Sequence, residues 1–434
     1  MSVVATRPVS SWGRLTAQDH RWIALTDRSR LADAIRGPGL AYGNGRSYGD
    51  VCLNPGGTLW GMRGLDRFID VDPQAGIIEC EAGVLLKEII DLVLPRGWFL
   101  PVVPGTQLVT VGGAIANDVH GKAHHSAGSF GHHVLSFELV RTDGRTITCS
   151  PTENADWFAA TVGGMGLTGV ITRARLQLRK VAGPWLDAET VPFDSLEEFF
   201  RLSTEARQRY EYTVAWIDCV SGGRGRGVFF QGNHGDQNNP MRAPRPKTFP
   251  LTPPVSLINT LSLRAFNFAY YRLNRLKARR GPQHYVPFFF PLDSLLEWNR
   301  VYGPRGFYQY QSVVPPAVQL EATRAMLDEI ARSGLGSFLA VLKTFGDKPA
   351  PGMLSFPMPG TTLALDFPNG GEPTLRLFDR LNAIVREAQG RLYSAKDACM
   401  PADLFAQGYP RISEFLRYRD PGIASAMSRR LLGS

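Results

Sequence analysis

The chain has 434 residues, of which 44% are hydrophobic and 20% charged, and its formal net charge is +9. These fractions are typical of a globular protein, and the length predicts two or three domains. The sequence contains no run of about eighteen apolar residues, so it predicts no membrane span. The N-terminus lacks the apolar core of a signal peptide.

The five cysteines are scattered, odd in number and form no C-x-x-C pair. This pattern favours a reduced compartment and argues against a thiolate metal site. We therefore expect a cytoplasmic protein, with peripheral membrane contact if the basic segment described below binds a membrane.

The periodicity of apolar residues predicts short helices and strands in the first part of the chain. Helices are predicted at 29–36, 84–94 and 154–162. Strands are predicted at 68–71, 77–81, 134–140, 146–148 and 167–178. Asp143-Gly144 predicts a hairpin turn between two of these strands.

The pattern of residues in the sequence changes at 181–184 (Val-Ala-Gly-Pro), and we place a domain boundary after residue 183. Helices are predicted at 196–207, 317–332 and 375–388, and strands at 212–219, 307–314, 338–345 and 361–367. Residues 221–254 are predicted to form a long loop, and 393–397 a short extended piece. The pattern is that of an α+β fold.

One stretch, residues 101–133, is unusually rich in glycine and histidine. It holds five of the eight histidines, and six glycines lie between Gly105 and Gly131. Such small residues leave backbone N–H groups uncovered, which suits a phosphate-bearing cofactor. A second glycine-rich turn lies at 39–49. A tight structural turn is the alternative interpretation.

Two other motifs in this region do not support their usual functions. Residues 164–169 match G-x-G-x-x-G, but a helix precedes the match and a strand follows it, which is the reverse of a dinucleotide-binding motif. His120 and His124, with Asp118, have metal-ligand character, but no further ligand stands at a recognisable spacing. We predict no metal site.

Two lysines are candidates for chemistry. Lys343 stands among apolar residues on a predicted strand, and Lys396 stands beside a carboxylate in the sequence Tyr-Ser-Ala-Lys-Asp. Burial would lower the pKa of either lysine and suit it to proton transfer or anion binding. The alternative is a surface lysine that keeps its ammonium in water.

Residues 241–280 contain nine Lys or Arg and no Asp or Glu, interleaved with leucine, phenylalanine and tyrosine. Basic charge mixed with apolar bulk fits a segment that contacts a membrane surface. A nucleic-acid-binding segment and a mobile surface loop are the alternatives, and we expect no nucleic-acid partner.

The glycine-rich stretches 43–50 (GNGRSYGD) and 104–134 resemble the FAD-binding domain of the vanillyl-alcohol-oxidase type, also called the PCMH type. Further matching pieces point to its branch of polyprenylphosphoryl-ribose oxidases. These pieces are ATVGGMGLTG (160–169), PLDSLLEWNRVYGPRGFYQYQ (291–311), FLAVLKTFG (338–346), LSFPMPG (354–360) and RLYSAKD (391–397).

The resemblance implies a two-domain fold with an antiparallel-sheet substrate domain. Residues 1–183 would bind FAD, 184–390 would bind substrate, and 391–434 would return to the FAD domain. The implied FAD contacts are Gly43, Asn44, Gly45, Arg46, Ser47, Tyr48, Gly49, Gly105, Thr110, Val111, Gly112, Gly113, Asn117, Asp118, Val119, His120, Ile171 and Tyr393. The implied substrate cleft contains Lys122, Gln309, Gln311, Lys343 and Lys396.

Three departures from the family pattern matter. Relatives with covalent FAD have a histidine near the position of Arg46, so we expect non-covalent FAD. Ala364 replaces a cysteine that covalent inhibitors attack, which predicts resistance to thiol-directed inhibition with the chemistry intact. Thr362 replaces an asparagine, so the resemblance defines the fold more firmly than the substrate.

The resemblance implies oxidation of C2 of the ribose of a polyprenylphosphoryl-β-D-ribose to a keto sugar, the first half of an epimerisation that makes an arabinose donor for cell walls. Hydride would pass to flavin N5, Lys396 would act near the reacting hydroxyl, and Gln311 and Lys343 would orient the substrate. A partner NAD(P)-dependent keto-reductase is implied. The alternatives are an aldonolactone or alditol oxidase and a non-catalytic flavin or lipid-phosphate binding protein.

Overall fold

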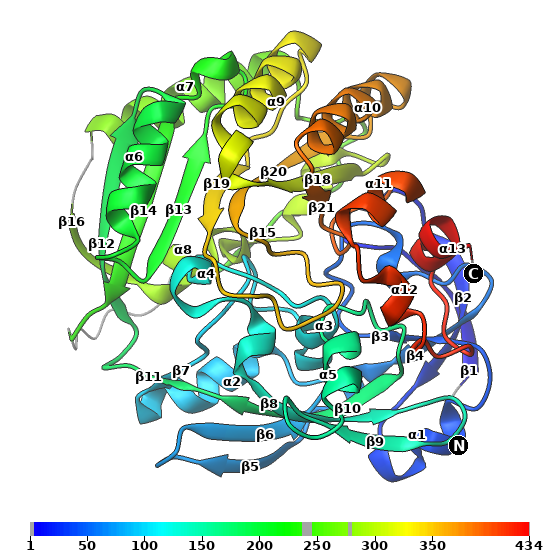
Figure 1. Ribbon diagram of the computed structural model, residues 1–434. Coiled ribbons are helices and arrows are strands. Elements are labelled where there is room, and N and C mark those ends of the chain that lie inside the picture. The colour runs from blue at the N-terminus through cyan, green and yellow to red at the C-terminus, as the bar shows by residue number, and fades with distance from the viewer. Residues whose placement is uncertain (1–3, 237–244, 277–279, 434) are drawn as a thin grey trace.

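The computed structural model describes residues 4–236, 245–276 and 280–433. Figure 1 shows a large sheet with helices over its outer side, and beneath it the smaller sheets formed by the first part of the chain. In these described ranges, no helix combines the length and apolar character needed to cross a bilayer.

The first part of the chain builds two small sheets. The four-stranded sheet has the order β1 (Val4–Val9), β2 (Gln18–Ala24), β4 (Thr58–Gly61) and β3 (Leu40–Tyr42). The five-stranded sheet has the order β5 (Phe68–Asp72), β6 (Ile77–Glu81), β10 (Val170–Gln177), β8 (Val134–Val140) and β9 (Thr146–Cys149). The predicted strands and hairpin of this region are therefore confirmed.

Short helices follow in this part of the chain, most of them beside the small sheets. They are α1 (Leu31–Ala34), α2 (Leu86–Val93), α3 (Val111–Ala116), α4 (His124–Ala127) and α5 (Ala155–Thr161). Helix α4 instead contacts the large sheet described next. Helix α2 forms because Leu86, Ile89, Ile90 and Val93 recur at helical spacing and are buried in one core cluster. The helices predicted at 84–94 and 154–162 are confirmed.

The large sheet has eight strands, and every neighbouring pair in it is antiparallel. Its order is β16 (Arg280–His284), β12 (Trp185–Phe193), β14 (Gly227–His234), β13 (Tyr212–Ile217), β19 (Ala340–Phe345), β20 (Gly360–Pro368), β18 (Phe307–Val314) and β21 (Arg391–Leu392). Helices α6 (Leu196–Ala206), α9 (Gln319–Ser333) and α10 (Glu372–Glu387) cover its outer face (Figure 1). The α+β prediction is confirmed.

Two local predictions are wrong. The predicted loop at 221–254 contains strand β14, whose Val228 and Phe229 are buried between β12 and β13. The apolar run of this strand, Val228–Phe230, is only three residues long, and glycine and asparagine surround it. The segment 393–397 is not extended, because the Lys396 N–H donates to the Tyr393 carbonyl at 3.0 Å and forms a turn.

The C-terminal segment connects the large sheet to the first glycine-rich turn. After β21 come α11 (Ala402–Gly408), α12 (Ile412–Phe415) and α13 (Ala426–Leu432). On α13, the Arg430 guanidinium lies 2.9 Å from the Asp50 carboxylate and 2.8 Å from the Asp397 carboxylate. One arginine therefore holds two loops together that are far apart in sequence.

Gly49 is the point of closest approach between these two loops. A Cβ atom at Gly49 would lie 1.5 Å from the Asp397 carbonyl oxygen, which is a backbone atom with no freedom to rotate away. We predict that Gly49→Ala lowers the free energy of unfolding by about 3 kcal/mol, because the two loops must separate. Urea denaturation of the purified variant measures this change.

Gly281→Ala is the matched control, because a Cβ there would meet no atom within 4 Å. An unchanged stability in Gly49→Ala would contradict the close packing of these loops.

Candidate active site

A cavity of about 300 Å³ lies between the glycine-rich loops and the inner face of the large sheet. This volume suits a small-molecule ligand. The structure brings most of the predicted site residues to its wall. These are Gly43, Asn44, Gly45, Arg46, Ser47, Tyr48, Gly105, Thr110, Gly112, Gly113, Asn117, Val119, His120, Ile171, Gln309, Gln311, Lys343, Tyr393 and Lys396.

Four predicted residues lie outside the cavity wall, and each has a structural contact instead. Val111 is buried in the core, and Gly49 packs on Asp397. The Asp118 carboxylate accepts hydrogen bonds from the Gly131 N–H and the Ser355 hydroxyl. The Lys122 ammonium donates to the Phe288 carbonyl.

The cofactor loop, residues 43–49, presents backbone donors. The N–H groups of residues 44–47 have no hydrogen-bond partner within the described part of the chain. The side chain of Asn44 fixes the loop by donating to the Leu108 carbonyl at 2.7 Å. Consecutive unpaired N–H groups are a binding site for anions such as the pyrophosphate of a dinucleotide.

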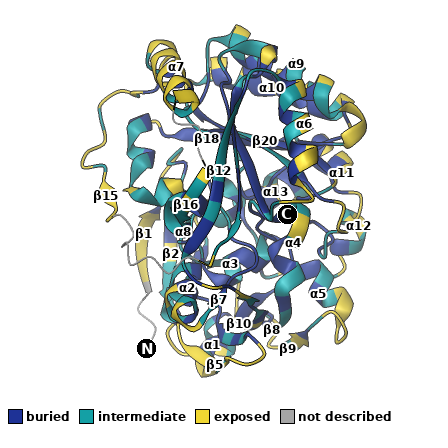
Figure 2. Ribbon diagram, turned by 90° about the vertical axis from the view of Figure 1, so that its left-hand side faces the viewer, coloured by how far each residue is buried: buried dark blue, intermediate teal, exposed yellow. Residues whose placement is uncertain are grey.

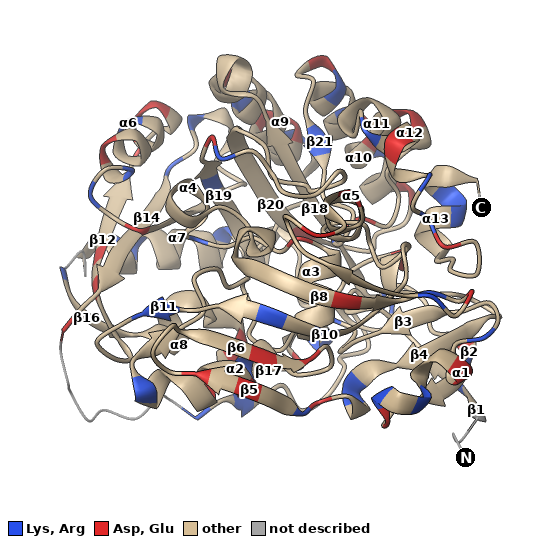
Figure 3. Ribbon diagram, turned by 60° about the horizontal axis from the view of Figure 1, so that its bottom comes forward, with Lys and Arg blue, Asp and Glu red and all other residues tan. Residues whose placement is uncertain are grey.

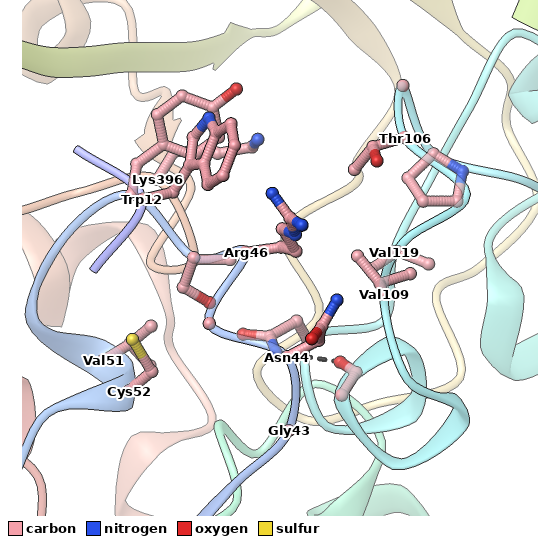
Figure 4. Close-up of a pocket in the computed structure, with 18 of the residues that line it drawn as sticks. Trp12, Gly43, Asn44, Arg46, Val51, Cys52, Thr106, Val109, Val119 and Lys396 are labelled. Atoms are coloured by element: carbon pink, nitrogen blue, oxygen red, sulfur yellow. Dashed lines mark hydrogen bonds between the residues drawn. The ribbon is translucent and has the colours of Figure 1, made fainter. Parts of the chain in front are cut away.

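Arg46 adds a positive charge to this loop. Its guanidinium lies 4.2 Å from the ring of Trp12, and its Nε has no partner among the described residues. In Figure 4 Arg46 reaches between Lys396 and Trp12 on one side and Thr106 and Val109 on the other. The cavity thus combines main-chain donors, an arginine and apolar walls, which fits a flavin dinucleotide.

The inner face of the large sheet supplies the other wall. Because side chains alternate along a strand, Gln309 and Gln311 of β18 point to the same face. In the register of the sheet they stand opposite Asp366 and Ala364 of β20. Lys343 of β19 stands opposite Thr362. Strand alternation therefore places two amides, a carboxylate and a lysine on one surface.

His120 connects the two walls. One of its ring nitrogens lies 3.1 Å from the Gln311 amide nitrogen, and the other lies 3.4 Å from the Lys343 ammonium. Burial and the nearby Lys343 charge lower the pKa of His120 well below its ordinary value. The ring is therefore neutral and able to accept a hydrogen bond from the lysine.

The lysines of the site are poorly solvated. Burial lowers the pKa of Lys343 to about 8. The Lys396 ammonium lies 3.7 Å from the ring centroid of Tyr48. Burial and the charge of Lys343 lower its pKa, while the Asp366 carboxylate opposes this change. A lysine of lowered pKa can accept a proton near neutral pH.

Asp366 was not predicted from the sequence. Its side chain is buried, one carboxylate oxygen lies 2.5 Å from the Gln309 amide nitrogen, and the other has no partner among the described residues. Burial raises its pKa, and the hydrogen bond from Gln309 and the charge of Lys396 only partly offset this rise. The two buried charges therefore stabilise each other electrostatically. Its signal in the sequence was weak, because Asp366 is an isolated acid in an apolar strand.

Several residues that line the cavity were also missed. Gly166 and Gly169 of the G-x-G-x-x-G match line the cavity, although a helix precedes the match and a strand follows it. The segment 292–298 covers the cavity, where the Asp293 carboxylate accepts from the Gln107 N–H at 2.9 Å. Among the residues in view, no group of three or more His, Cys, Asp or Glu could hold a metal ion.

Comparison with known proteins agrees with this site. Residues 24–150 match the FAD binding domain family. The chain is 38% identical to decaprenylphosphoryl-beta-D-ribose oxidase of Mycolicibacterium smegmatis, over 98% of this chain and 97% of that protein. It is 32% identical to an uncharacterized protein in the mprA 5′ region of Streptomyces coelicolor, over 80% of this chain and 100% of that protein.

A more distant relative matches about a third of the chain. Human delta(24)-sterol reductase is 31% identical over 35% of this chain and 29% of its own length. The fold, the cavity and these matches define an FAD-dependent oxidoreductase that acts on CH–OH groups. Within this class, the chain belongs to the family of decaprenylphosphoryl-beta-D-ribose oxidase.

The lowered pKa of Lys343 implies a cost in stability. Since its folded pKa of about 8 lies below the ordinary 10.5, the buried ammonium destabilises the fold at neutral pH. We predict that Lys343→Met raises the free energy of unfolding of the FAD-free protein at pH 7 by up to about 3 kcal/mol. The difference should shrink as the pH rises from 8 to 10.5, because the lysine then loses its proton in both states.

Chemical denaturation at several pH values measures this difference. The exposed Lys348, replaced by Met, is the control and should show no such gain. A destabilised Lys343→Met at pH 7 would contradict the assignment.

Proposed function

We propose that this protein oxidises the C2 hydroxyl of the ribose of a polyprenylphosphoryl-β-D-ribose to a keto group, the first half of an epimerisation to an arabinose donor. The observation that carries the proposal is the convergence of Gln311, Lys343 and Lys396 on one cavity beside the cofactor loop. The similarity to the Mycolicibacterium enzyme along nearly the whole chain supports this substrate class.

When bound, FAD supplies the hydride acceptor for the carbinol carbon. We propose that Lys396 removes the hydroxyl proton, because burial favours its neutral form. Lys343 and Gln311 hold the sugar, and the ring of His120 lies within 3.4 Å of both of these side chains. The apolar wall excludes water from the reacting carbon.

FAD is proposed to bind without a covalent bond, because Arg46 stands where covalent relatives have histidine. The predicted contacts that line the cavity would hold it, with the unpaired N–H groups of residues 44–47 on its phosphates. We also propose the division into residues 1–183 and 391–434 for FAD and 184–390 for substrate. The Arg430 contacts to Asp50 and Asp397 support the return of the C-terminal segment.

Two partners follow from this function. The keto product needs a reductase that uses NAD(P)H to complete the epimerisation. A substrate with a polyprenyl tail resides in a membrane, so we propose peripheral membrane contact near the cavity. The basic segment 241–280 is the candidate; residues 241–244 and 277–279 of it lie outside the described residues.

The role of Lys396 is tested by anaerobic reduction of the bound flavin with polyprenylphosphoryl-ribose. We predict that Lys396→Ala slows the reduction by about 100-fold or more, because a general base is lost. Lys348→Ala, at an exposed position, is the control and should reduce at the wild-type rate. A Lys396→Ala variant that keeps most of the rate would contradict the role.

The pH dependence of the same reaction identifies the base. The rate should rise with pH as Lys396 loses its proton. The Asp366 carboxylate raises the pKa of Lys396, so Asp366→Asn should move this rise to lower pH. If the pH profile of Asp366→Asn coincided with that of the wild type, the titrating group would not be Lys396.

A further inference from the structure

Helix α7 (Thr260–Leu276) presents an apolar stripe to solvent. Leu261, Phe268 and Leu276 are 79%, 53% and 83% exposed. At helical spacing these residues lie on one line with Ala265 and Arg272. The opposite face buries Leu263, Asn267 and Tyr271. The helix is therefore packed on one side and apolar on the side that no described residue covers.

The exposed apolar surface continues into the chain before the helix. Leu251, Val255 and Leu257 are 73%, 67% and 45% exposed. In Figure 2 this exposed run extends along one side of the molecule from β15 (Lys247–Thr248) to α7. We call the exposed residues of the segment 245–276 the docking face. So many large exposed apolar side chains in one segment indicate a surface that binds a partner.

The charge of the docking face has one sign. Residues 245–276 contain five Lys or Arg and no Asp or Glu. By contrast, Figure 3 shows acidic and basic residues mixed on α6 and on the five-stranded sheet. Arg264 is exposed beside the apolar stripe, and the Arg272 guanidinium lies 5.5 Å from the Phe268 ring. Guanidinium groups beside leucine and phenylalanine fit anionic headgroups above acyl chains.

The docking face adjoins the cavity through two contacts. Strand β15 pairs with β17 (Leu295–Leu296), and both residues of β17 line the cavity. The Phe266 ring lies 4.7 Å from the ring of Phe338, whose neighbour Leu339 also lines the cavity.

The inner side of the helix strengthens this link. Leu263 packs in one core cluster with Ile258 and Tyr48, and Tyr48 lies under the Lys396 ammonium. A partner that covers the docking face is thus held next to the catalytic wall.

The geometry points to an anionic lipid bilayer as the partner of the docking face. Leu261, Phe268 and Leu276 enter the boundary between headgroups and acyl chains, while Arg264 and Arg272 contact lipid phosphates. The substrate class rests on the proposed function. For such a substrate, this placement lets the polyprenyl tail stay in the bilayer while the sugar reaches Lys396. Nucleic acid is a poorer fit, because it would leave the leucines and phenylalanine uncovered.

The test is co-sedimentation of the FAD-loaded full-length protein with vesicles of phosphatidylglycerol and phosphatidylcholine that contain no substrate. We expect binding that weakens in high salt and with phosphatidylcholine alone. The double variant Leu261→Glu/Phe268→Glu should lower the partition into vesicles by about tenfold or more. Because no turnover is measured, this result is independent of the proposed sugar oxidation.

The matched control is Phe68→Glu/Leu416→Glu, at residues that are 39% and 44% exposed elsewhere on the molecule. It should sediment like the wild type. The flavin absorbance of each variant reports folding, and Arg264→Glu gives a second variant that removes charge without apolar area. The proposal would be overturned if the wild-type protein stayed in the supernatant, or if both double variants lost vesicle binding equally. It would also be overturned if the protein were retained on duplex DNA but did not bind vesicles.

Discussion

The unpaired backbone N–H groups of the cofactor loop are the constraint on which the site depends. A loop with free donors is unstable unless other segments fix it. Gly49 packs directly on the Asp397 carbonyl, and Arg430 contacts the carboxylates on both sides of this junction. The C-terminal segment therefore fixes the loop, and the same junction sets the Lys396 side chain against Tyr48.

The second constraint is the cost of burying cations together. Burial lowers the pKa of both Lys343 and Lys396, and the charge of Lys343 lowers the pKa of Lys396 further. Asp366 is the buried carboxylate that offsets this repulsion. Such an arrangement is unfavourable for folding but supplies a neutral base and a cation within one cavity. The buried lysines that supply the chemistry therefore also lower the stability of the fold.

The sequence predicted the elements whose apolar period is regular. Strand β18 was found from its alternation, and with it the shared face of Gln309 and Gln311. Strand β14 was missed because its apolar run is only three residues long, and its burial depends on pairing with two neighbouring strands. Asp366 was missed because its contact with Gln309, across 57 residues, depends on strand register. The turn at Lys396 likewise depends on contacts outside its own segment.

The most direct test of the account is the visible absorption spectrum of the purified protein before and after acid precipitation. The account predicts a flavin spectrum that passes entirely into the supernatant, because the cofactor loop holds FAD through N–H groups and Arg46 without a covalent bond. A colourless protein that takes up no added FAD would contradict the cofactor loop itself. Colour that stays in the pellet would show a covalent bond and contradict the role of Arg46.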